Sequence, residues 1–331
     1  MSPKFRIEAI TPDAARDFWQ DCPQASAFTQ PDILARCAER VDWWGAWRSD
    51  DLVATWPVCF PDVETTPRSP TFLYYVGPLF SAEIQQFKYH RYQAIRQQAL
   101  ETLIAFLIER YSGLGFALPP GQTDIRAFDW WNHEHPELAG FQIRPRQTAR
   151  IDDLGRSAEA LHSDFARNRK RDLRQDMEAV LLPAKDWKIG ELIELHNQPF
   201  QRQDLDLCPN RMQALKSVIA AASDNGTVLA WRDQENGQLA CAIVLLYGKT
   251  DANNILCVAA DPWRERGLSA WTTWQGIQRA RADGKKIFDF NGANSPQRAA
   301  DKHSYGAQAE LYFNITLPGQ PKRRLSHQHV R

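Results

Sequence analysis

The sequence lacks the short motifs that mark several common classes of enzyme and metal site. Its six cysteines form no CxxC or CxxH pair, which excludes a zinc ribbon and a redox dithiol. It also has no GxSxG elbow, no GxxxxGKS/T loop and no GxGxxG motif, which argues against a hydrolase, an NTPase and a Rossmann dehydrogenase. His133 and His135 have a spacing that suits a metal on a strand, but no third ligand accompanies them. We therefore expect no metal cofactor.

An excess of charge of either sign is also missing. The 331 residues contain 40 Lys and Arg and 40 Asp and Glu, so the formal net charge is zero. Proteins that rely on contacts with nucleic-acid phosphates normally carry a cationic surplus. The composition therefore disfavours nucleic acid as the main partner, while 43% apolar residues suffice for a large core.

Long apolar runs are absent too. The longest, Leu239 to Tyr247, is too short to span a membrane, and the opening MSPKFRIEAITPD has no apolar signal core. We expect no integral membrane segment and a reducing, cytoplasmic setting.

The order of the predicted elements suggests two lobes. In the first half, Thr11-Pro12-Asp13 and Thr29-Gln30-Pro31-Asp32 are typical helix starts, and two aromatic runs around Ser49-Asp50-Asp51 predict a β-hairpin. The remaining expectations there are strands at 5–10, 71–76 and 115–120 and a helix at 82–111. In the second half we expect strands at 149–153, 179–182, 228–232, 238–247, 254–259, 286–290 and 312–317, and helices at 157–175, 187–198, 210–222 and 262–282.

Both halves thus run strand, helices, hairpin, strand, amphipathic helix, strand. The order predicts an α+β fold of two mixed α/β lobes, each a mostly antiparallel sheet flanked by helices. We place the lobes at residues 1–150 and 151–317, followed by a disordered tail at 318–331. One irregular α/β domain is the alternative.

A strand that ends at Asp261-Pro262 leads into a helix start at residues 263–270. Backbone N–H groups at a helix start can hold a pyrophosphate or a carboxylate. Here the spacing Arg264-x-x-Gly267-x-Ser269 resembles the Q/R-x-x-G-x-G/A pyrophosphate loop of GNAT acyltransferases, with Ser where Gly or Ala is usual. The resemblance implies an acyl-coenzyme A site made by Arg264, Arg266, Gly267, Leu268, Ser269 and Ala270. The alternative is an ordinary helix start with surface arginines.

A second pattern points to a narrower family. Phe288-Asp289-Phe290-Asn291-Gly292, followed by Lys302-His303-Ser304-Tyr305-Gly306, resembles the strand–glycine–K-x-x-F/Y-G signature of Fem-type peptidoglycan aminoacyltransferases and related tandem-GNAT proteins. Pieces such as YYVGPLF, RQTARIDD and PFQRQDLDLCP fit the same template, so the resemblance covers most of the chain.

This resemblance implies two GNAT-like lobes that face a central cleft, with the acyl donor held by the C-terminal lobe. The activity would be transfer of an acyl group to an amine of a small molecule or of a cell-envelope or polysaccharide precursor. We favour acyl-coenzyme A over aminoacyl-tRNA as the donor. A non-catalytic GNAT-like protein that binds its ligand without transfer is the alternative from another class. Oligomeric state stays open.

The resemblance also implies roles for single residues. Lys302 matches the family lysine that stabilises an oxyanion or binds an anionic group. Independently of the resemblance, Asp289 alternates with Phe288 and Phe290 on a strand, so it is expected to face away from the two rings. There it either accepts a proton from the amine or pairs with an arginine or lysine. The residues expected to contact the acceptor are Arg202, Gln203, Asn291, Asn294 and Tyr305.

The basic run at 167–174 has two interpretations. Arg167, Lys170, Arg171 and Arg174 share one face of a single helix, which suits a substrate diphosphate, tRNA or an acidic lipid surface. A solvated cationic face balanced by nearby acids is the alternative.

Overall fold

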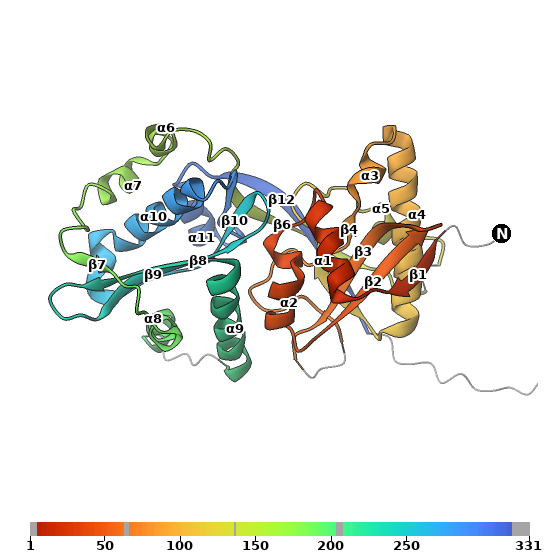
Figure 1. Ribbon diagram of the computed structural model, residues 1–331, viewed down its shortest axis with the longest axis horizontal. Helices are drawn as coiled ribbons and strands as arrows, with labels where there is room; N and C mark the ends of the chain where they lie inside the picture. The colour runs from red at the N-terminus through yellow and green to blue at the C-terminus, as the bar shows by residue number, and fades with distance from the viewer. Residues whose placement is uncertain (1–4, 63–65, 136, 203–207, 320–331) are drawn as a thin grey trace, which may run out of the picture.

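The computed structural model describes residues 5–62, 66–135, 137–202 and 208–319. The N-terminal lobe is built on a small antiparallel sheet in the order β1-β2-β3-β4. Its strands are β1 (Arg6–Ala9), β2 (Arg40–Arg48), β3 (Asp51–Phe60) and β4 (Leu79–Phe80). β2 and β3 form the hairpin that the aromatic runs predict. The helix α4 (Tyr89–Arg110) packs its apolar side on this sheet, in a core that includes Trp56, Leu103 and Phe116 (Figure 1).

The helix starts of this lobe follow their sequence signals. The Thr11 hydroxyl accepts a hydrogen bond from the Ala14 N–H at 3.2 Å, and Pro12 opens α1 (Pro12–Asp21). Pro31 likewise opens α2 (Pro31–Cys37). The remaining short helices are η1 (Ala27–Thr29), α3 (Ala82–Gln85) and α5 (Arg126–Asp129).

A second sheet of eight strands carries the C-terminal lobe, in the order β5-β12-β6-β11-β10-β9-β8-β7. Only the pair β10–β11 is parallel. The strands are β5 (Leu114–Ala117), β6 (Gln142–Ile151), β7 (Leu181–Pro183), β8 (Gly226–Asp233), β9 (Leu239–Tyr247), β10 (Asp251–Ala259), β11 (Ile287–Asp289) and β12 (Gln308–Leu317).

Helices cover both faces of this sheet. α10 (Leu268–Ala282) and α7 (Arg167–Asp172) lie on one face, whereas α8 (Ile189–Gln201) and α9 (Pro209–Asn225) lie on the other (Figure 1). Of these helices, α9 lies beside α2 of the N-terminal lobe. The remaining elements are α6 (Ala158–Ser163), η2 (Asp261–Arg266) and α11 (Pro296–His303). No helix within the described ranges is long and apolar enough to cross a membrane.

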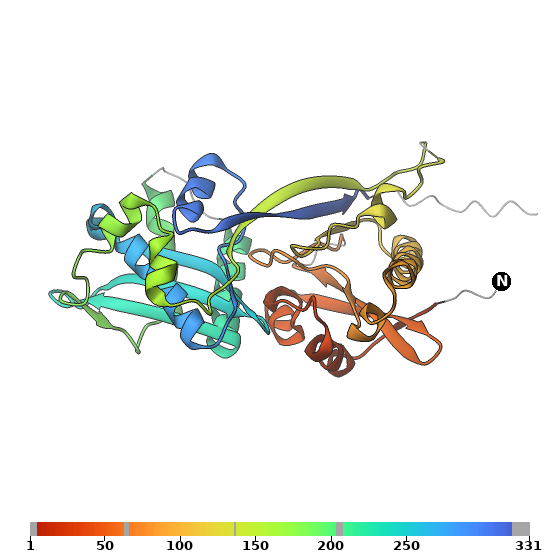
Figure 2. The same cartoon turned by 90° about the horizontal axis from the view of Figure 1, so that it is seen from above.

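Two long strands join the lobes. β6 and β12 pair over nine residue positions, from Gln308 opposite Arg150 to Thr316 opposite Gln142, and the far half of β12 also pairs with β5. Figure 2 shows this ribbon running from one lobe to the other. The fold therefore confirms the α+β class and the two mixed lobes, with antiparallel-rich sheets flanked by helices.

Several expected elements differ from the structure, and three of them concern positions outside the donor loop. Residues 71–76 form no strand, because Phe72 takes a left-handed φ of 73°. The helix expected at 157–175 is two short helices, since Ala166 is extended and donates its N–H to the Ser304 carbonyl at 2.8 Å. The helix expected at 82–111 breaks at Lys88, which is also extended. In each case a local turn or tertiary contact overrides the periodic pattern.

Candidate active site

The parallel strands β10 and β11 separate after a short contact. They pair at only three positions, the last being Asn253 opposite Asp289. Beyond that point, residues 290–293 follow β6 through the bond from the Ala293 N–H to the Gln147 carbonyl, while β10 continues along β9 with a register shift between Asn254 and Leu256. The backbones thus diverge into a wedge inside the sheet.

Asp289 sits where the wedge begins. Phe288 and Phe290 pack into the core of the C-terminal lobe, so the carboxylate faces the opposite way, as the alternation predicts. It accepts hydrogen bonds from the Asn291 N–H at 2.7 Å, from the Tyr75 hydroxyl at 3.2 Å and from the Thr148 hydroxyl. No lysine or arginine of the described chain forms an ion pair with it. Burial therefore dominates and raises the pKa of Asp289 to about 6.

The carboxylate belongs to a polar row across three strands. Asn253, Asp289 and Arg150 are opposite one another on β10, β11 and β6, and cross-strand neighbours point to the same face. All three line a cleft of about 530 Å³ between the lobes, together with Tyr75 and Gln122 of the N-terminal lobe. Asp289 is thus a buried carboxylate that lines a ligand-sized space.

Lys302, the second expected catalytic residue, lies close to Asp289 near the end of α11. Its ammonium donates to the Gly292 carbonyl at 2.9 Å and to the Asn291 carbonyl. Asn291 therefore touches Asp289 through its N–H and Lys302 through its C=O. Burial lowers the pKa of Lys302 to about 8, and the nearby Asp289 charge opposes that shift. Because an ammonium has three donors, one N–H is left without a partner among the described residues.

Asn291 and Asn294 shape the turn after β11. Asn291 is buried with a left-handed φ of 54°, and its side-chain N–H₂ donates to the Asn254 carbonyl at 2.9 Å, bridging the wedge. Its side-chain oxygen is buried without a partner in the part of the chain described. Asn294 accepts from the Gln147 N–H and donates to the Tyr312 hydroxyl, so it ties the turn to β6 and β12.

The local structure of the donor loop differs from the single helix start that the sequence predicts at 263–270. Residues 261–266 form η2, and α10 begins only after Gly267, which has a left-handed φ of 76°. Leu268 and Ala270 point into the core, while Ser269 is exposed. Arg266 stacks on the Trp263 ring at 4.4 Å, and the side chain of Arg264 lies outside the described residues. The side chains of Leu268 and Ala270 are therefore not available to a ligand, and the Ala270 N–H already donates to the Gly267 carbonyl at 3.0 Å.

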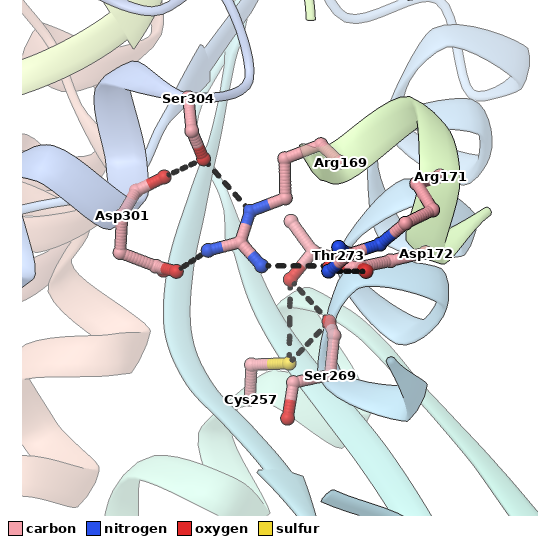
Figure 3. Close-up of polar contacts among 8 residues, drawn as sticks. All are labelled: Arg169, Arg171, Asp172, Cys257, Ser269, Thr273, Asp301 and Ser304. Atoms are coloured by element: carbon pink, nitrogen blue, oxygen red, sulfur yellow. Dashed lines mark hydrogen bonds and ion pairs between the residues drawn. The ribbon is translucent and has the colours of Figure 1, made fainter. Parts of the chain in front are cut away.

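The backbone at Gly267 is closely approached by α7. A Cβ on Gly267 would lie 2.8 Å from Asp172 Cβ, so only glycine fits there. Asp172 is in turn held by Arg169, which also donates to Ser304 at 2.8 Å and pairs with Asp301 (Figure 3). Arg169 therefore fastens α7 to α11, the helix that carries Lys302.

The wedge also contains a thiol and a phenol. Cys257 on β10 lies 3.5 Å from the Thr273 hydroxyl and 3.8 Å from the Ser269 carbonyl on α10 (Figure 3). Burial raises the pKa of Cys257 to about 11, so the thiol is protonated near neutral pH. Tyr305 is buried, stacks on Phe290 at 5.5 Å and lies below Arg169 at 5.1 Å. It supports the wedge from the core.

The other expected contacts are spread out. Arg202 ends α8, pairs with Asp261 at the start of η2 and is not among the residues that line the cleft. Gln203 lies outside the described residues.

In the basic run, helix α7 ends at Asp172, so Arg174 leaves the expected face, and Arg169 is the member that turns inward. Sequence reasoning gave Tyr75, Thr148 and Arg169 no role of their own in the site. The first two lie in the quoted pieces YYVGPLF and RQTARIDD and the third in the basic run, but no local pattern distinguishes them from their neighbours. Within the described ranges, no group of three or more His, Cys, Asp or Glu side chains could hold a metal.

Comparison with known proteins agrees with this architecture. Residues 161–298 match the model of the acetyltransferase (GNAT) domain family. FemX superposes with a TM-score of 0.63 at 11% identity, over 93% of this chain and 96% of its own. A tandem GNAT protein from the clavulanic acid biosynthesis pathway superposes with a TM-score of 0.56 at 13% identity, over 96% of this chain and 99% of its own. The C-terminal domain of a putative lysylphosphatidylglycerol synthetase from Agrobacterium fabrum superposes with a TM-score of 0.54 at 11% identity, over 93% of this chain and 91% of its own.

A search of the curated proteins gave no match. At the identities above, the likeness to solved structures concerns the fold, and the matched domain model gives the class of enzyme. The chain therefore carries an acyltransferase domain of the GNAT type at residues 161–298, set within a Fem-like tandem-GNAT fold.

Proposed function

We propose that this protein transfers an acyl group from an acyl-coenzyme A thioester to a primary amine bound in the cleft between the lobes. The observation that carries the proposal is Asp289, a buried carboxylate without a cationic partner in the described chain, at the point where β10 and β11 separate. A carboxylate with a pKa of about 6 is ionised at neutral pH and basic enough to take a proton from a bound ammonium.

The steps of this reaction balance as follows. The ammonium of the acceptor gives one proton to Asp289, directly or through a water, and the free amine attacks the thioester carbonyl. A C–N bond forms, and the carbonyl becomes an oxyanion beside the third N–H of Lys302. The C–S bond then breaks, the thiolate takes the second proton from nitrogen, and amide and coenzyme A leave.

Lys302 suits the oxyanion role because it is both charged and fixed. Two of its donors hold the 291–292 turn, which orients the third. Thioester carbonyls that develop negative charge are stabilised by donors that are already in place. In this proposal the backbone N–H groups of Gly267, Leu268 and Ser269 bind the coenzyme A pyrophosphate, which requires Asp172 to move away from Gly267.

Two further parts of the proposal concern the biological setting. We propose a small-molecule or cell-envelope precursor as the acceptor and a cytoplasmic location, in keeping with the Fem-like fold. Aminoacyl-tRNA is the alternative donor. The exposed Arg167, Arg171 and Arg174 favour a polyanionic donor of either kind.

The test is a transfer assay on the full chain. Acetyl-coenzyme A is supplied with a panel of primary amines, and free thiol and amide are measured together. We expect amine-dependent thiol release matched one to one by amide, with thermal stabilisation by acetyl-coenzyme A. A Lys302→Ala variant should lose at least 100-fold in kcat. Full transfer by that variant would remove the role of Lys302, and transfer only from aminoacyl-tRNA would replace the donor. Binding of amines with no transfer from any donor would support the non-catalytic alternative.

A further inference from the structure

The cleft between the lobes contains polar atoms that the protein itself leaves unsatisfied. Ser26 is 8% exposed, and its hydroxyl oxygen has no hydrogen-bond partner in the described chain. The same holds for both ends of the Gln122 carboxamide and for Nε of Arg150. All three residues line the one cleft. Since buried polar groups are nearly always paired, these atoms indicate a ligand that supplies the partners.

The charges around the cleft determine what kind of ligand fits. Arg96 is paired with Asp124 at 3.1 Å, and the two terminal nitrogens of Arg150 are paired with Asp152 and Glu310. Both cations are thus neutralised. By contrast, Asp251 and Asp289 line the cleft without an ion pair to any described lysine or arginine. A cationic ligand is therefore favoured and an anionic one disfavoured.

The unsatisfied atoms are of both hydrogen-bonding kinds. Arg150 Nε and Gln122 Nε2 donate, Gln122 Oε1 accepts, and the Ser26 hydroxyl does both. A hydroxyl group also does both, so several hydroxyl groups on one ligand can pair with donors and acceptors alike. The rings of Tyr75, Tyr89 and Tyr92 complete the wall, and about 530 Å³ accommodates a small polar molecule of one or two rings.

We propose that the cleft binds a polyhydroxylated primary amine, an amino sugar, with its ammonium toward Asp289 and Asp251 and its hydroxyl groups toward Ser26, Gln122 and Arg150. This inference rests on the proposed function in one respect, namely that the amine beside Asp289 is the acyl acceptor. The binding itself is independent of transfer.

The experiment measures binding to the full chain by isothermal titration calorimetry. The probes are D-glucosamine, D-glucose, which lacks the amine, and cyclohexylamine, which lacks the hydroxyl groups. D-glucosamine should bind at least 10-fold more tightly than either, and glucosamine 6-phosphate should bind more weakly because the cleft has no unneutralised cation. Equal binding of cyclohexylamine and D-glucosamine, or tighter binding of the phosphorylated sugar, would overturn the inference.

Variants locate the site. Gln122→Met keeps the size of the side chain and removes both hydrogen-bonding ends, so the affinity for D-glucosamine should fall about 10-fold while that for cyclohexylamine stays unchanged. Ser26→Ala should lower the D-glucosamine affinity in the same selective way, and serves if the first variant fails to fold. The matched control is Gln20→Met on the exposed side of α1, which should change neither affinity. Unchanged D-glucosamine affinity in both cleft variants would contradict the proposal.

The two proposals fail separately. Selective D-glucosamine binding without acyl transfer to any amine would leave the amino-sugar site standing and remove the proposed function. Acyl transfer to other amines such as L-lysine, without selective D-glucosamine binding, would do the reverse.

Discussion

At the residue scale, the central feature is a carboxylate that neutral donors hold in place. Hydroxyl and backbone donors orient Asp289, but none of them carries the positive charge that would lower its pKa. Burial therefore outweighs the hydrogen bonds, and the pKa rises from 3.8 to about 6. Such a group costs stability when it ionises, which is the pattern expected at a site kept for chemistry.

This cost gives a stability prediction. Because the folded pKa of Asp289 is raised, its favourable contribution is fully present below pH 3.8 and is lost as the pH rises through about 6. Relative to Asp289→Asn, the free energy of unfolding of the wild type should fall by roughly 2 kcal/mol between pH 4 and pH 7. Urea titrations of both proteins across that range measure the difference. A difference that does not vary with pH would show that Asp289 is not buried as described.

A second residue-scale prediction concerns the route of transfer. The Cys257 thiol lies in the wedge, but its pKa of about 11 leaves almost no thiolate at neutral pH. The acyl group should therefore pass directly to the amine. Cys257→Ala should keep kcat within about threefold, and intact-mass spectrometry with acetyl-coenzyme A alone should find no acyl-enzyme. An acyl adduct on the wild type that is missing from the variant would establish a covalent route instead.

At the scale of elements, α7 is fastened across the start of α10. Arg169 reaches from α7 to Ser304 and Asp301 around α11 (Figure 3). Asp172 on the same helix lies against Gly267. The three helices that surround the wedge are thus linked through one side chain and one close backbone contact. Movement of α7 and access to the helix start at Gly267 are coupled for this reason.

A comparison of two glycines distinguishes the stability cost of a left-handed backbone from the cost of disturbing the contact between α7 and Gly267. Gly267 and Gly284 have nearly the same φ, 76° and 75°, but a Cβ meets Asp172 at 2.8 Å in the first and nothing within 4 Å in the second. Gly284→Ala should cost about 1 kcal/mol through φ alone. Gly267→Ala should cost roughly 1–3 kcal/mol more, because α7 must also shift. Chemical denaturation of both variants measures this. Equal costs would mean that α7 does not rest on Gly267.

Much of the element order could be predicted from the sequence, and the failures have common causes. The Thr11-Pro12 start, the hairpin at Ser49–Asp51 and the outward face of Asp289 depend on local chemistry and period. The strand at 71–76 was wrong because Phe72 lies in a local turn with a left-handed φ. The single helix at 157–175 was wrong because Ala166 is extended and bonds to the distant Ser304. The cleft was expected from the family resemblance alone, since its residues come from both lobes.

At the scale of the whole molecule, the lobes share structure instead of merely touching. β12 pairs with both β5 and β6, α2 packs on α9, and the Gln30 amide donates to Asn225 at 2.9 Å. The hydrogen bond from Tyr75 to Asp289 also crosses between lobes. The position of the candidate base is thus set by the way the two lobes are joined.

Shared structure predicts cooperative unfolding. Ile315 and Ile277 are fully buried, the first in the N-terminal core and the second on α10 in the C-terminal core. Replacing either by Ala should cost about 2–4 kcal/mol. We expect each variant to lower hydrogen-exchange protection in β3 and in β9 alike, because neither lobe unfolds alone. Loss of protection confined to the substituted lobe would show that the lobes are independent.

The most direct test of the account is the pH dependence of kcat/KM for wild type and Asp289→Asn, measured with acetyl-coenzyme A and the best acceptor amine. For the wild type we predict a bell that rises through about pH 6 as Asp289 ionises and falls through about pH 8 as Lys302 loses its proton. Asp289→Asn should lose at least 100-fold at pH 7 and should lack the rise near pH 6. An unchanged acid limb with near-normal activity in Asp289→Asn would contradict the claim that this carboxylate takes the proton from the amine.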